Sequence, residues 1–363
     1  MPDLFPSRTL TIYMAKMFAV RSFAVLALLV IVLQVLDLLG ESDAILRYPG
    51  NGQGEILTYV SLRVPGIIQR FLPFCILLGT IITLATLNQN SEVVSMKAAG
   101  LSAHQVLAPL IVASLVIAGL SFAFNERIVT RATATLKSWE AAEYGKMPSG
   151  REAMSNIWVR EGDDLIHANI VEGRGATTVL TGVSVYDRTG GTLAKIVTAD
   201  RATATATGWQ LENAESFDVT SGIKSALGTI MVAPTVRPDQ FTLANVDGAG
   251  LPFDELQTAI ADLKAAGRPS AAVEAALWHK ISGPLSTVLM PLLGAVAAFG
   301  LARSGKLFVR AVVGMMLGFL YFVADNFGLA MGNLGAYPPL LAAWGPFFLF
   351  LLIGEAVLIR TEE

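Results

Sequence analysis

The chain has 363 residues, of which 53% are hydrophobic and 15% are charged, and its formal net charge is −3. A soluble domain rarely carries so apolar a balance, and the small negative charge excludes the basic field expected of a nucleic-acid-binding protein. The single cysteine, Cys75, excludes an intrachain disulfide, and the three histidines lack the spacing of metal ligands.

Six apolar windows approach the roughly 20 residues that a helix needs to cross a bilayer, so we expect six transmembrane helices with both chain ends on one side. Lys16 and Arg21 precede the first window, as in a signal peptide. No small-residue cleavage site follows it cleanly, and we expect it to stay as the first span. The windows are Ser22–Leu39, Val64–Leu87, Val106–Phe124, Ile281–Ala302, Leu307–Ala330 and Pro339–Leu358.

The basic residues of the short loops predict the orientation. The segment between spans four and five holds Arg303, Lys306 and Arg310, whereas the turn Met331–Pro338 holds no lysine or arginine. The positive-inside rule then places both ends in the cytoplasm, although two arginines in the first outer loop oppose this. The polar insertion between spans three and four is therefore expected to be extracytoplasmic.

That insertion, Arg127–Ala276, alternates apolar and polar residues in short runs such as Val183-Ser184-Val185-Tyr186. Such runs between glycine and aspartate turns are typical of antiparallel strands. We expect seven or more strands, in a sandwich, jelly roll or open barrel that encloses an apolar trough. The expected divisions are residues 1–126 with three spans, 127–250 as the β domain, 251–276 as a linker helix, and 277–363 with three further spans.

One segment, Gly300–Leu307, nearly matches a phosphate-binding P-loop. Leu307 stands where a serine or threonine would hold magnesium, and the segment follows a membrane helix instead of a strand. No nucleophile, histidine and acid set stands out elsewhere, and the sequence gives no case for an enzyme. A nucleoside triphosphate that drives this protein must therefore be hydrolysed by a different chain.

The loop between spans two and three, residues 88–103, predicts a short helix, Glu92–Ala99, on the membrane surface. Ser91 is the expected N-cap and Gly100 the expected stop. The helix would be either a solvated connector or a coupling helix docked in a cytoplasmic ATPase. Val93, Met96 and Ala99 would share one face, with Glu92 and Lys97 placed to meet a partner.

Three polar residues interrupt the apolar windows: Gln34 and Asp37 in the first, and Asp325 in the fifth. Polar groups within a span usually face a cavity or a partner helix. For Gln34 an interhelical hydrogen bond and a substrate contact are both open. For Asp325 a helix-packing anchor is favoured over a carboxylate that faces a cavity.

The segment Ser91–Gly100 resembles the second-loop motif of the lipopolysaccharide export permease family, LptF/LptG. The likeness runs the length of the chain and is greater to the LptG branch. The other residues that carry it are Leu36-Asp37, Val64-Pro65, Pro73, Asn156-Ile157-Trp158, Asp325-Asn326-Phe327-Gly328 and Pro338-Pro339.

This resemblance implies an inner-membrane half-transporter with a periplasmic β-jellyroll. Its implied partners are an LptF-like paralogue, an LptB-like ATPase dimer, an LptC-like bitopic protein and an LptA-like periplasmic bridge. Lipopolysaccharide would enter between the first span of one permease and the fifth span of the other. The chain itself would bind no cofactor, because ATP and magnesium would lie on the ATPase. Ser91, Glu92, Val93, Met96, Lys97 and Gly100 would transmit the ATPase movement.

The chain departs from the family at the outer end of span one, where relatives carry lysines and this sequence has Gln34, Gly40 and Glu41. Recognition of lipid phosphates must then be weaker or lie elsewhere, or the lipid carries fewer phosphates or acidic sugars instead. By location we nominate six cations, namely Arg47, Arg63, Arg70, Arg127, Arg131 and Lys137.

A function of a different class also fits the sequence. The chain could be a mechanotransmitting or scaffolding membrane protein whose outer β domain binds another protein while an ATPase moves its helices. Lipid contacts within the β domain would favour transport, whereas a groove closed by large side chains would favour the scaffold.

Overall fold

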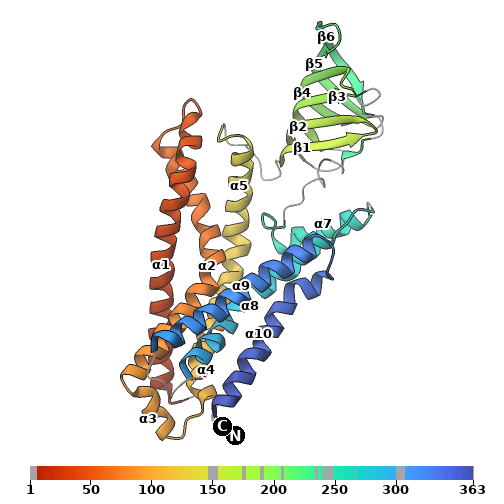
Figure 1. Cartoon of the computed structure of the whole chain (residues 1–363). Helices are drawn as coiled ribbons and strands as arrows, with labels where there is room; N and C mark the ends of the chain where they lie inside the picture. The colour runs from red at the N-terminus through yellow and green to blue at the C-terminus, as the bar shows by residue number, and fades with distance from the viewer. Residues whose placement is uncertain are drawn as a thin grey trace.

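The computed structural model describes residues 6–145, 154–173, 177–188, 192–205, 208–233, 236–238, 241, 248–265, 267–299 and 307–362. Long helices form one body, and a sheet stands at one end of it (Figure 1). The helices are α1 Arg8–Arg47, α2 Gln53–Gln89, α3 Glu92–Ala98, α4 Ala103–Phe124, α5 Thr130–Ala141, α7 Phe253–Ala265, α8 Ala271–Phe299, α9 Leu307–Asn333 and α10 Pro339–Glu362, with a π-helix, η1 Asn125–Val129, between α4 and α5.

Within the described residues, five helices are long and apolar enough to cross a membrane. They contain the expected spans one, two, three, five and six. The expected fourth span, Ile281–Ala302, corresponds to α8 but runs into residues 300–302, which lie outside the described part of the chain. The P-loop-like segment falls almost wholly in the same gap, as do Arg303 and Lys306.

Three helices are much longer than a bilayer requires: α1, α2 and the continuous helix α4–η1–α5. At 1.5 Å per residue, the 40-residue α1 is about 60 Å long, twice the roughly 30 Å of a hydrocarbon core. The continuous helix α4–η1–α5 spans Ala103–Ala141 and is of similar length. The start of α1 and the end of α10 lie at the same end of the body as α3 (Figure 1). The surplus length of the three helices therefore projects at the opposite end, toward the sheet.

The sheet has six antiparallel strands among the described residues, each paired with the next along the chain. This simple order differs from the expected jelly roll, whose strands cross between sheets, and the count is below the expected seven. β1 lies nearest the helices and β6 farthest from them (Figure 1). The strands are β1 Met154–Glu161, β2 Asp164–Glu172, β3 Val179–Asp187, β4 Lys195–Thr205, β5 Gly208–Asp218 and β6 Lys224–Val232.

The β domain begins later than expected, because the start of the block is helical. We expected it at Arg127, but α5 continues to Ala141 and the first strand starts at Met154. The buried apolar residues of α5, Ala132, Leu136 and Trp139, recur at spacings of three or four, which is the helical period. The expected linker helix is present as α7, which packs on α8 through Leu256, Ile260, Leu263 and Val273.

Candidate functional site

Helix α3 forms the expected loop helix, but its buried face is not the surface offered to a partner. Val93 and Met96 are 4% and 7% exposed and belong to the core of the long helices. Val94, on the other face, is 62% exposed. Lys97 is also exposed. Val93 and Met96 thus share one face, as their spacing predicted, whereas Ala99, expected on the same face, is exposed. The surface left for a partner carries Val94 together with Lys97, which was expected to meet one.

The two ends of α3 are set by left-handed backbone. Gly100 has φ of 88°, which suits glycine, and Leu101 N donates to Met96 O at 3.1 Å to close the helix. Ser91 has φ of 58°, and its hydroxyl does not cap the helix, contrary to our expectation. Left-handed backbone is strained for a side chain other than glycine and often marks functional sites. The loop is thus held in a defined conformation.

Glu92 ties α3 to the first long helix. Its carboxylate accepts hydrogen bonds from Tyr13 Oη and Asn90 Nδ2, both at 3.3 Å. On the other side of the loop, His104 Nε2 lies 3.3 Å from Glu355 of α10. A displacement of α3 would thus be passed to α1 directly and, through α4, to α10.

At the opposite ends of the helices, Asp37 of α1 is held by two groups of α2. Tyr59 Oη donates to it at 2.6 Å, and Arg63 donates through Nε and Nη2. Arg63 was nominated as a lipid-phosphate partner, but much of its hydrogen-bonding capacity is already used by Asp37. The pair instead fixes the sheet-side part of α1 on α2.

An aromatic cluster secures the same region. Tyr144 packs edge-to-face against Trp139 and Tyr59, with ring centroids 5.3 and 6.1 Å apart. Its hydroxyl donates to Glu41 at 2.8 Å. Burial, reinforced by this hydrogen bond, raises the pKa of Tyr144 above its ordinary value. Glu41 therefore has a packing role in this chain.

Four of the other nominated cations are more available. Arg47, Arg70, Arg127 and Arg131 are exposed, and the described residues offer none of them an ion pair. Arg127 and Arg131 lie one helical turn apart on η1 and α5, so they share a face. Lys137 is exposed farther along α5. Two neighbouring arginines on one face can bind an anion that neither binds well alone.

Two polar residues of the spans have different surroundings. Gln34 is 8% exposed, and neither its amide nitrogen nor its amide oxygen is bonded to any described group. A buried unsatisfied amide is costly and usually indicates a partner or water. Asp325, in contrast, lies 3.1 Å from His279 Nε2 and links α9 to α8.

Sequence reasoning missed Tyr13, Tyr59, Glu126, His279 and Lys280. The last four lie within five residues of the end of an apolar window, whereas Tyr13 lies nine residues before the first window and gave no such signal. Glu126 and Lys280 form an ion pair of 2.8 Å between η1 and α8. Ionisable groups at the borders of spans are thus used here to join helices.

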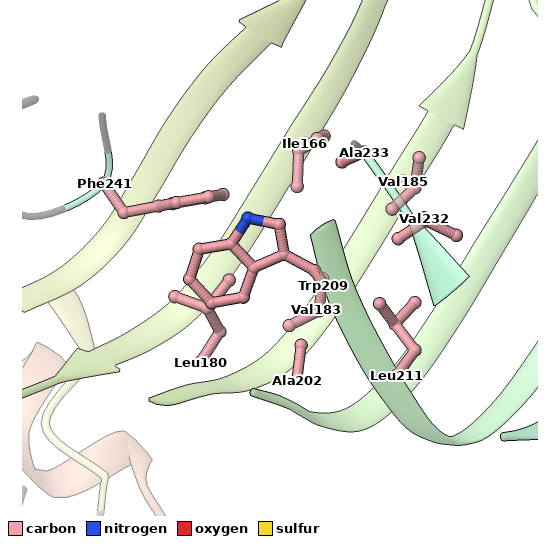
Figure 2. Close-up of a pocket in the computed structure, with 10 residues that line it drawn as sticks. All are labelled: Ile166, Leu180, Val183, Val185, Ala202, Trp209, Leu211, Val232, Ala233 and Phe241. Carbon is pink, nitrogen blue, oxygen red and sulfur yellow. The ribbon is translucent and has the colours of Figure 1, made fainter. Parts of the chain in front are cut away.

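The sheet carries an apolar pocket lined by Ile166, Leu180, Val183, Val185, Ala202, Trp209, Leu211, Val232, Ala233 and Phe241 (Figure 2). Trp209 and Phe241 pack edge-to-face inside it, with centroids 5.1 Å apart. Trp209 Nε1 donates to Val236 O at 2.8 Å. Both rings are at most 2% exposed. The apolar face expected to form a trough is therefore filled by the chain's own aromatic side chains.

Comparisons with known proteins identify the family. Over 331 residues the chain is 28% identical to the lipopolysaccharide export system permease protein LptG of Escherichia coli K12, covering 87% of this chain and 89% of that protein. It is 24% identical to LptG of Haemophilus influenzae over 340 residues, covering 87% and 90%. The model of the lipopolysaccharide export system permease LptF/LptG family matches residues 12–360. The chain therefore belongs to the LptF/LptG permease family and is similar to its LptG members.

Proposed function

We propose that this chain is the permease subunit of an ATP-driven ABC transporter for lipopolysaccharide. It would extract the lipid from the outer leaflet of the inner membrane and pass it to a periplasmic bridge for export to the outer membrane. Support comes from membership of a family of lipopolysaccharide export permeases and from relatives that bear that name.

The geometry of α3 is the observation that supports the proposal that an ATPase drives this chain. A short helix exposes Val94 at one end of the molecule, and Glu92 beside it is bonded to α1. A cytoplasmic LptB-like ATPase dimer would dock on this face and move α1 through Tyr13. ATP and magnesium would be bound by that ATPase, and this chain would hold no cofactor.

The proposed topology has six spans, cytoplasmic termini and a periplasmic β domain. It is supported by the two ends of the described chain, which lie beside α3 and away from the sheet (Figure 1). An LptF-like paralogue would complete the membrane part, and an LptC-like protein and an LptA-like bridge would continue from the β domain. Arg70, Arg127 and Arg131 would meet phosphates of the lipid near the outer ends of the helices.

The test is affinity purification of the chain from its native membrane in mild detergent, with mass spectrometry of the partners. We expect a paralogous permease and an ATPase with the wild type, and loss of the ATPase with Glu92→Ala. Tyr13→Phe is the matched control, because it removes one hydrogen bond to Glu92 but leaves the carboxylate. Recovery of the wild-type chain without any ATPase would refute the transporter.

One observation favours the scaffold as a second candidate function: the apolar face of the sheet is filled by Trp209 and Phe241. A photocrosslinker at Leu211, which lines the pocket, distinguishes the two functions. Crosslinks to lipid would show that the aromatic side chains move aside for transport. Crosslinks only to protein would favour a β domain that binds a partner, and a probe at exposed Lys224 controls for random collisions.

A further inference from the structure

Glu126 of the π-helix η1 joins three segments that are distant in the sequence. Lys280 Nζ donates to its Oε1 at 2.8 Å, and the backbone N–H of Phe253 donates to its Oε2 at 2.6 Å. Lys280 lies on α8, and Phe253 is the first residue of α7. One carboxylate thus connects the extension of the third span, the linker helix and the fourth span.

The contact is buried and therefore hard to open. The side chains of Lys280 and Glu126 are only 5% and 17% exposed. Separating a buried ion pair leaves charges without compensation, which is strongly unfavourable. The carboxylate also lies at the N-terminus of α7, where the helix dipole favours a negative charge. The three segments should therefore keep this arrangement as the rest of the protein moves.

The location of the contact matters because both connections to the sheet pass beside it. α5 continues directly from η1 and leads toward β1, whereas α7 receives the chain on its return from the sheet (Figure 1). Glu126 therefore fixes the start of the returning helix against the base of the outgoing one. The π-helix that presents Glu126 is a rare element that occurs frequently at functional sites.

We propose that Glu126, paired with Lys280 and bonded to Phe253, is a positioning residue that holds α5 and α7 in one arrangement and so transmits movement of the membrane helices to the β domain. The inference rests on the proposed transport function, because extraction of lipid is the work that this movement would serve.

The variant Glu126→Gln tests this contact in the complex of the chain with its paralogue and ATPase. Glutamine keeps an oxygen for the Phe253 N–H but loses the charge that holds Lys280. We expect lipid extraction to fall about fivefold while ATP hydrolysis stays within about twofold of wild type, as for a coupling defect. The reversed pair Glu126→Lys with Lys280→Glu keeps the ion pair between η1 and α8, although the new lysine of η1 cannot accept from the Phe253 N–H at the start of α7. It should therefore restore only a small part of the extraction.

Glu274→Gln is the matched control. It removes the 2.9 Å ion pair with Lys264, which joins the other end of α7 to α8 and is more exposed. Extraction by this variant should stay near wild type. An equal loss in both variants would overturn the inference, because any weakening of α7 would then suffice.

A second measurement follows the arrangement of α5 and α7 directly. Spin labels at the exposed positions Ala134 of α5 and Gln257 of α7, with Cys75→Ala, report the distance between the two helices. We expect one narrow distribution in wild type, with and without trapped nucleotide, and a broad one in Glu126→Gln. A narrow distribution in Glu126→Gln, with normal extraction by that variant, would overturn the inference. So would failure of both Glu126→Gln and the reversed pair to assemble with an active ATPase. A wild-type complex that extracts no lipid would refute the proposed function instead. The label distances would still show whether Glu126 fixes α5 and α7 in one arrangement.

Discussion

Arg63 donates to the carboxylate of Asp37 through two groups: Nη2 at 2.7 Å, and Nε, whose single N–H lies 3.1 Å from both carboxylate oxygens. It so joins α1 and α2 near the sheet-side end of α1. Tyr59 donates to the same carboxylate from the preceding turn of α2. Because α1 packs mainly on α2 and α4, this contact is a principal anchor of the sheet-side half of α1. Asp37 and Arg63 therefore hold the two helices together, and their bonding to each other leaves Arg63 less able to bind a lipid.

The first prediction follows from that anchor. Asp37→Ala leaves Arg63 and Tyr59 without their acceptor, and we expect a loss of about 1–3 kcal/mol of stability, since the site is only partly exposed. The double variant Asp37→Ala with Arg63→Ala should cost less than the sum of the two single variants, because both remove the same interaction. Thermal unfolding in detergent measures all three, and Arg70→Ala is the control. Additive costs would contradict the anchor.

The second prediction concerns the two adjacent valines of α3. Val94→Asp changes a residue that is 62% exposed, so stability should change by less than about 0.5 kcal/mol. Recovery of the ATPase should nevertheless fall sharply, because a charge is placed in the proposed docking face. Val93→Asp should instead destabilise the chain itself, since Val93 is buried.

The measurement is the ratio of ATPase to permease after affinity purification, together with the melting temperature of the permease. Unchanged ATPase recovery by Val94→Asp would place the docking face elsewhere on the molecule.

The long helices could be predicted from the sequence because apolar length is a local signal, and the ends of α3 could be predicted from Ser91 and Gly100. That Val93 and Met96 share one face of α3 could also be predicted, from their helical spacing. That this face packs on the core could not be predicted, because it depends on the packing of α3 against α2 and α4. The hydroxyl of Ser91 likewise does not make the cap that its residue type suggests.

The candidate site was predicted less well than the fold. Arg63 was nominated as a phosphate partner, but it is bonded to Asp37, which lies 26 residues away on another helix. The strands were predicted by alternation, whereas their number and order depend on which strands pair, which is a property of the whole sheet. The helical spacing of Ala132, Leu136 and Trp139 was present in the sequence and was overlooked among threonines.

The third prediction concerns the arginines that have no ion pair among the described residues. Replacing Arg127 and Arg131 together by alanine should raise the lipid concentration that half-saturates the stimulation of ATP hydrolysis about tenfold, if one charged hydrogen bond of about 1.5 kcal/mol is lost. The defect should shrink at high salt, because salt screens exposed charges in wild type as well. Arg70→Ala should show a smaller effect of the same kind.

The measurement is a lipid titration of ATPase activity in the purified complex at low and high ionic strength. Lys224→Ala, on β6 far from the helices, removes a charge without touching the proposed lipid path and is the control (Figure 1). A half-saturating concentration unchanged by the double variant would exclude these arginines as phosphate partners.

The last prediction is a pH dependence of the β domain at His167. Its ring lies 4.4 Å from the ring of Trp158 on the neighbouring strand, and burial lowers the pKa of His167. The folded state therefore favours the neutral imidazole. The stability that depends on this residue is fully present above the ordinary pKa of about 6.5 and is lost as the pH falls through the lower folded-state pKa.

His167→Asn removes the titrating group and keeps a polar side chain of modest size. Urea unfolding followed by tryptophan fluorescence, at pH values from about 7.5 to 5, should show a decline in stability on acidification that is smaller in the variant than in wild type. The difference in slope should appear only below about pH 6.5, because above it the imidazole is neutral in both the folded and the unfolded chain. Equal slopes throughout would mean that protonated His167 is accommodated beside Trp158 without cost, and that other groups determine the acid sensitivity of the sheet.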